Sequence, residues 1–172
     1  FVNTEANWKD AEGWKEALDR FESKVQEVLI INEKSSIVEI VEDLQKFLDI
    51  NIYSKFISLQ HLEVNMKKIM GYLERINADH QLDDHILIIL NLLFDCATHF
   101  QKGRDSLAIL ILAHQGLDLI LKVDKNLERK LARAIGEHYS ALREYRLAAY
   151  YLGYAVQQSG DDKEEVLALL LN

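Results

Sequence analysis

The chain has 172 residues, with 28 acidic and 20 basic side chains, a formal net charge of −8, one cysteine and no proline. This length supports a hydrophobic core without metal or disulfide staples, and 49% apolar residues exclude intrinsic disorder. The acidic balance argues against nucleic-acid binding, which needs an excess of lysine and arginine on one face. The longest apolar run, Ile86 to Phe94, is too short for a membrane span, which needs about 20 residues.

The compartment is predicted from the cysteine count. The single Cys96 cannot form an intrachain disulfide, which fits a reducing, intracellular location in the cytoplasm or nucleus. The chain begins at Phe1 without a basic-then-apolar leader, so we expect it to be a fragment of a longer protein.

The first predicted element is a long amphipathic helix from residue 4 to 31. Roughly eight prolines would be average for this length, so their absence favours helices throughout, and no strand is expected. The apolar stripe has spacings of three and four residues: Trp8, Ala11, Trp14, Leu18, Phe21, Val25 and Val28. Because tryptophan is a common interface anchor, Trp8 and Trp14 either bury in the core or form a docking surface.

A capping pattern and a second apolar stripe predict the next two helices. Ser36 to Glu39 has the form of a capping box, which predicts a helix starting there and ending near Leu48. Another helix is predicted over residues 62–76. The apolar spacing over residues 37–73 resembles the small helical bundle of the TFIIS amino-terminal domain and the LEDGF integrase-binding domain. That resemblance implies binding of short linear motifs in disordered partners.

A loop is predicted over residues 77–84, with Asp83 or Asp84 capping a helix that runs to about Phe100. A turn over residues 102–105 then leads into an apolar helix ending near Val123.

After a turn at Lys125 and Asn126, two helices are predicted over residues 128–141 and 144–158. A final leucine-rich helix should start near Asp161, and its apolar surface would need a partner or a fold-back contact.

Residues 131–155 resemble one tetratricopeptide helical hairpin. The matching positions are small or aromatic: Gly136, Tyr139, Ala148 and Ala155. Ala132 and Gly160 depart from the family, which prefers a large aromatic residue and a proline there. Independently of the family, Gly136 and Ala148 allow two helices to approach closely. Residues 84–123 are similar to a more divergent hairpin around Gly103.

We therefore predict an all-α fold of about eight or nine helices in stacked antiparallel hairpins, similar to tetratricopeptide arrays or α-solenoids. Two parts are expected to pack as one compact unit: an amino-terminal helical bundle over residues 1–77 and tetratricopeptide-like hairpins over residues 84–172.

Candidate chemistry is sparse. The segment Asp79 to His85 gathers three carboxylates and two imidazoles, but helix capping by the aspartates and solvation of the histidines explain it. Cys96 and His99 lie three residues apart on one helix, yet no oxyanion-binding loop accompanies them, so core packing is favoured. The lone histidines receive no functional role: His61, His114 and His138. We expect no enzyme, metal or cofactor; the most distant alternative is a metal enzyme using His80, Asp84 and His85.

Charge is segregated along the chain. Residues 1–49 hold 12 acidic and 6 basic residues, whereas residues 122–146 hold seven basic and four acidic residues. If the hairpin is tetratricopeptide-like, its first helix presents a groove-facing stripe of Lys130, Arg133, Glu137 and Ser140, and an acidic peptide is the natural ligand. The same charges can equally be solvated or pair with the acidic side chains of residues 1–49. Chaperone-binding members of that family have an asparagine where this chain has Glu137, which disfavours capture of a carboxy-terminal carboxylate.

The predicted function is a non-enzymatic scaffold or adaptor domain that binds a peptide or helix of a protein partner within a larger complex. The alternative is a structural module that self-associates into a homo-oligomer through the Trp8/Trp14 helix or the leucine-rich end. Neither a nucleic acid nor a membrane is an expected partner.

Overall fold

A computed structural model describes residues 19–20, 22–27, 29–30, 34–51, 58–122 and 124–158. Trp8, Trp14 and the leucine-rich end after residue 158 lie outside these ranges, as do the predictions made for them. The described residues are almost entirely helical and contain no strand, so the all-α prediction is confirmed.

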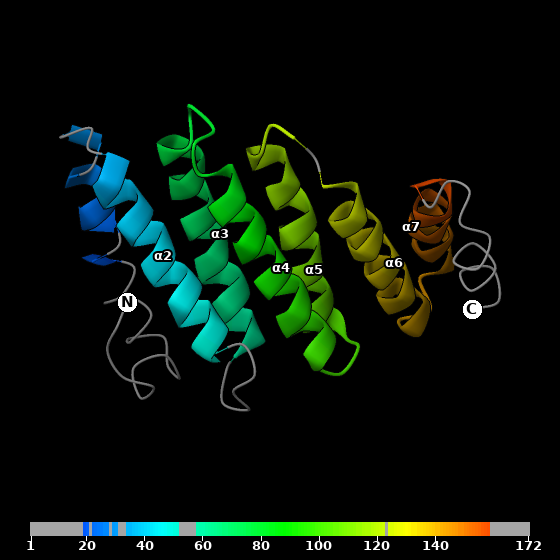
Figure 1. The fold of residues 1–172 in the computed structure, drawn as a ribbon. Coiled ribbons are helices and arrows are strands. Elements are labelled where there is room, and N and C mark those ends of the chain that lie inside the picture. The colour runs from blue at the N-terminus through cyan, green and yellow to red at the C-terminus, as the bar shows by residue number, and fades with distance from the viewer. Residues whose placement is uncertain are drawn as a thin grey trace.

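Seven helices are assigned within the described ranges, slightly fewer than the eight or nine expected, and short helical stretches also occur between residues 19 and 30. They are α2 (Lys34–Asn51), α3 (Leu59–Ile76), α4 (Asp83–His99), α5 (Arg104–Gly116), the 3-10 helix η1 (Leu117–Leu119), α6 (Lys125–Ala141) and α7 (Tyr145–Gln158). From α3 to α7, the connections lie alternately at the two ends of the stack, so consecutive helices run antiparallel (Figure 1).

The helices form two layers. Helix α2 packs against α4, and α4 touches α6, whereas α3 packs against α5 (Figure 1). Helix α7 belongs to the second layer, because the ring of Tyr151 meets the ring of His114 on α5 edge to face. Contacts are densest between α6 and α7, and α4 and α5 also pack closely, as do α5 and α6. Each hairpin therefore stacks on the one before it.

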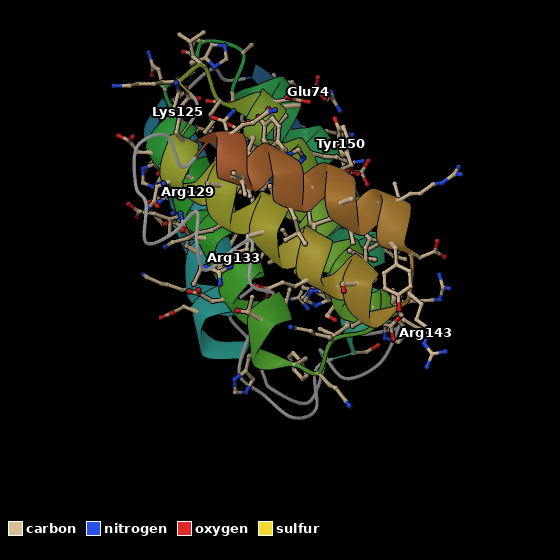
Figure 2. The ribbon with its side chains drawn as sticks, turned by 90° about the vertical axis from the view of Figure 1, so that its right-hand side faces the viewer. Glu74, Lys125, Arg129, Arg133, Arg143 and Tyr150 are labelled. Carbon is tan, nitrogen blue, oxygen red and sulfur yellow. The ribbon has the colours of Figure 1, made fainter. Side chains whose placement is uncertain are left out.

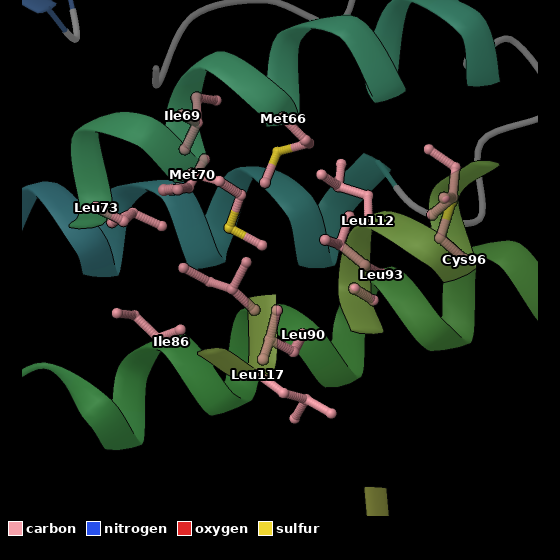
Figure 3. Close-up of a cluster of buried hydrophobic side chains, with 14 of the residues drawn as sticks. Met66, Ile69, Met70, Leu73, Ile86, Leu90, Leu93, Cys96, Leu112 and Leu117 are labelled. Carbon is pink, nitrogen blue, oxygen red and sulfur yellow. The ribbon is translucent and has the colours of Figure 1, made fainter. Parts of the chain in front are cut away.

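One buried cluster fills the space between the layers. It extends from Val25, on the predicted first stripe, to Ile135 on α6, so it includes side chains from both predicted parts of the chain. Figure 3 shows its centre, where side chains of α3 and α4 meet those of α5 and η1: Met66, Ile69, Met70, Leu73, Ile86, Leu90, Leu93, Cys96, Leu112 and Leu117. At about 25 cal/mol per Å² of buried apolar surface, this cluster is the main stabilising term.

Several predicted helix ends are wrong. Helix α2 already includes Lys34, so the Ser36–Glu39 pattern is not its start. Leu82, not Asp83 or Asp84, is the N-cap of α4, and both aspartates lie in its first turn, where carboxylates also complement the helix dipole. Helix α5 ends at Gly116 and not near Val123, because a 3-10 turn follows, in which Leu117 is buried, as is Ile120 directly after it.

The start of α6 shows side-chain capping. Asp124 Oδ1 accepts hydrogen bonds from the backbone N–H groups of Asn126 and Leu127, at 3.0 and 3.1 Å. This cap satisfies two amides that lack a partner within the helix. The helix therefore begins at Lys125, where a turn was predicted; Lys125 is exposed, and Arg129 one turn later is half-buried.

A buried asparagine joins the two loops at one end of the stack. Asn77, only 3% exposed, ends α3; its Oδ1 accepts from Leu82 N–H at 2.8 Å. Its Nδ2 donates to Asp83 Oδ1 at 2.8 Å and to the Leu119 carbonyl at 3.1 Å. Asp83 Oδ2 in turn accepts from Leu121 N–H at 3.0 Å. These bonds fix the α3–α4 loop to the segment after α5.

Candidate functional site

The predicted stripe lies on one side of α6. The opposite side of the helix buries Leu131 and Ile135 completely. Lys130 is exposed and the other three predicted residues are half-buried: Arg133, Glu137 and Ser140. Their spacings of three and four residues repeat at the helical period, so the structure does bring the four positions together along one helix face.

Two of these residues form an ion-pair cluster with a loop lysine. Arg133 Nε donates to Glu137 Oε1 at 3.1 Å, and Lys102 Nζ lies 3.6 Å from Glu137 Oε2. Lys102 belongs to the turn between α4 and α5, so this cluster of Lys102, Arg133 and Glu137 bridges two elements. The sequence did not indicate Lys102, because its partner lies 35 positions further along the chain.

A row of basic side chains extends the stripe toward the start of α6. Figure 2 shows Lys125, Arg129 and Arg133 following one another along α6, on the side opposite Tyr150 and Glu74. Arg129 Nη2 donates to Asn126 Oδ1 at 2.9 Å. The three bases recur every fourth residue, which is about one helical turn; the sequence analysis did not predict this row, because it placed Lys125 in a turn.

Helix α7 presents aromatic and apolar side chains. Tyr145, Leu147 and Tyr150 are 66%, 43% and 68% exposed. Tyr151 stacks on Tyr139 of α6, with ring centroids 5.7 Å apart, and also meets Tyr150 edge to face. The exposed ring of Tyr150 is therefore anchored on the packed pair of Tyr139 and Tyr151.

The predicted metal candidates serve a structural role or lie apart. His80 Nδ1 lies 3.3 Å from Asp83 Oδ1. Burial alone would raise the pKa of Asp83, but hydrogen bonds from Asn77, Leu121 and His80 lower it below its ordinary value. Nowhere in the described ranges do three or more His, Cys, Asp or Glu side chains come together in a group that could hold a metal ion.

Cys96 is a core residue. It is fully buried on α4, and burial raises the pKa of its thiol to about 12. A nucleophilic cysteine needs the opposite shift, because the thiolate is the reactive form. His99, three residues on, is exposed, and its ring packs against Phe100. The prediction of core packing at Cys96 is confirmed.

His138 lies in the contact between α5 and α6, although no role was predicted for it. It is 2% exposed; Nδ1 donates to the Ala134 carbonyl at 2.7 Å, and Nε2 lies 3.1 Å from the Ser106 hydroxyl oxygen. Burial lowers the pKa of His138; the hydrogen bond to Ala134 and the charge of Glu137 oppose this shift, and Lys102 adds to it.

This lowered pKa predicts a pH-dependent stability. The folded protein favours neutral His138, so its stabilising contribution is full above the unfolded pKa, about 6.5, and is lost as the pH falls toward the lower folded pKa. Urea unfolding of the wild type should give a free energy of unfolding that decreases from pH 7 to 5. His138→Gln should reduce this decrease and cost about 1–3 kcal/mol at pH 7. Equal slopes in the two proteins would contradict the prediction, since all other histidines are shared.

Comparison with known proteins gives no relative. No family model matches the sequence, and neither a curated protein nor a solved structure matches it significantly. Among the helices that the structure describes, none has the length and apolarity needed to cross a membrane.

Proposed function

We propose that this chain is a non-enzymatic interaction domain that binds an acidic peptide or helix of a partner protein on the outward face of α6. The observation that carries this proposal is the basic row of Lys125, Arg129 and Arg133, with exposed Lys130 beside it, in a protein whose net charge is −8. A local positive face on an acidic protein selects partners of opposite charge and speeds their association.

The packing of α6 on α7 supports a tetratricopeptide-like hairpin as the scaffold of this face. A Cβ at Gly136 would lie 3.2 Å from the backbone nitrogen of Leu152, so the two helices approach closely there. Ala148 and Ala155 are buried, as small consensus residues of such hairpins would be. The resemblance of residues 37–73 to the TFIIS-type bundle stays a prediction. We place the protein in the cytoplasm or nucleus.

The proposal is tested with a charge-reversed face. Lys130→Glu/Arg133→Glu should reduce capture of a specific partner from lysate at least tenfold, with an unchanged circular dichroism spectrum. The matched control is Lys68→Glu/Arg75→Glu on α3, which changes the same charge at exposed positions of another helix. If the α6 variant retains the partner as well as the control does, the α6 face is not the binding site.

Self-association is the second candidate function, and the exposed α7 side chains favour it. Tyr145, Leu147 and Tyr150 would bury apolar surface against a second copy. Sedimentation velocity separates the two functions: a mass that rises with concentration supports self-association, whereas a constant monomer mass leaves the α6 face as the functional surface.

A further inference from the structure

We propose that Glu137 is an internal competitor of the acidic ligand, a carboxylate that weakens binding on the α6 face and so sets a minimum charge for the partner. This inference rests on the proposed function, because it concerns the same surface. One predicted member of the binding stripe should oppose binding, whereas its neighbours promote it.

The geometry gives Glu137 the place of a ligand carboxylate. Its Oε1 accepts from Arg133 Nε, and its Oε2 faces Lys102 Nζ, so each oxygen already has a cation. The two cations come from different elements, α6 and the α4–α5 turn. An acidic side chain of a partner that reached this position would meet the same two cations.

The internal contacts are weak enough to be replaced. The side chains of Arg133 and Glu137 are 36% and 29% exposed, and that of Lys102 is 51% exposed. Ion pairs between side chains that are this exposed to solvent contribute little net stability to the fold. The negative charge of Glu137 nevertheless stays at the end of the basic row, between Arg133 and Lys102, where it repels any incoming carboxylate. Binding is therefore restricted to ligands with several acidic residues.

If Glu137 instead positioned Arg133 for binding, its neutralisation would change the ligand affinity in the opposite direction. If Glu137 held the guanidinium of Arg133 in its binding orientation, neutralising Glu137 would weaken binding. If Glu137 competes, neutralising it removes the repulsion and frees two cations. Because the ligand carboxylate would lie within a few Å of Glu137 in partly hydrated surroundings, binding should strengthen about three- to tenfold at low salt. The direction of the change distinguishes the two roles.

The experiment uses the full chain and a fluorescein-labelled oligoglutamate peptide, followed by fluorescence anisotropy at low salt. Glu137→Gln keeps the side-chain size and removes one negative charge. The matched control is Glu63→Gln on α3, which also removes one negative charge, so both variants have the same net charge. Glu63 pairs with Lys67 at 3.1 Å, with the same i,i+4 spacing as Arg133 and Glu137. Circular dichroism and urea unfolding confirm that both variants fold.

Tighter binding by Glu137→Gln than by Glu63→Gln supports the inference, including the case in which only Glu137→Gln binds measurably. Equal binding by the two variants, weaker binding by Glu137→Gln, or no binding by any protein overturns it. The proposed function is judged separately by Lys130→Glu/Arg133→Glu: if wild type binds and this variant binds equally well, the α6 face is not the site, whatever Glu137→Gln does.

Discussion

Replacing Asn77 with alanine is expected to lower the free energy of unfolding by about 2–4 kcal/mol, because the side chain of a buried residue loses three hydrogen bonds at once. Asn77 binds the backbone of Leu82 and Leu119 and the carboxylate of Asp83. The N–H of Leu82 is buried, so it would stay without its acceptor. Alanine gains little from helix propensity here, since residue 77 caps α3 and does not lie in its interior.

Urea unfolding monitored by circular dichroism measures this loss, with Asn91→Ala as the matched control. Asn91 makes a single side-chain hydrogen bond, from Nδ2 to the Leu87 carbonyl one turn earlier in α4, at 2.9 Å. That bond is local and half-buried, so its removal should change stability by no more than about 0.5 kcal/mol. Similar losses in both variants would show that the Asn77 contacts do not join the two loops.

The sequence was sufficient for the all-α class and for the extent of several helices. The stripe through Met66, Ile69 and Leu73 repeats at the helical period and is buried in α3, as predicted. The loop before α4 and the α6–α7 hairpin also lie where turn residues indicated them. These features depend on contacts within one helix or between adjacent helices, which local patterns record.

The features that the sequence did not reveal depend on distant contacts. Asn77 reaches Leu119 across 42 positions, and Lys102 reaches Glu137 across 35. Neither pair has a spacing that a local pattern could indicate. The end of α5 was missed for another reason: Leu117 and Ile120 are buried in the following turn, so the apolar pattern continues although the helix does not.

The α6 stripe itself was a local feature and was found, but its internal chemistry was not. Spacing alone placed Arg133 and Glu137 on the same face. Their hydrogen bond and the approach of Lys102 show that this face already contains a paired anion. The sequence showed that the stripe combines two bases with one carboxylate, but not that the carboxylate is already paired with cations from two elements.

Gly136→Ala is the second substitution with a large expected effect, a loss of about 1–3 kcal/mol in the free energy of unfolding. An added Cβ would lie 2.7 Å from Leu152 Cγ and 3.2 Å from its backbone nitrogen. A branch carbon and a backbone atom cannot move away as easily as a side-chain end. Helix α7 would have to shift outward, which weakens the densest helix contact in the described fold.

The same substitution at Gly153 isolates this packing effect from helix propensity. Gly153 lies in α7 with no atom within 4 Å of an added Cβ, so alanine there should stabilise the protein by about 0.5–1 kcal/mol. Both changes gain helix propensity, but only Gly136→Ala meets the neighbouring helix. Urea unfolding should therefore separate the two variants by about 2 kcal/mol or more. If Gly136→Ala is as stable as Gly153→Ala, α6 and α7 do not pack as closely at this position as the structure has them, and the proposed scaffold of the binding face loses this support.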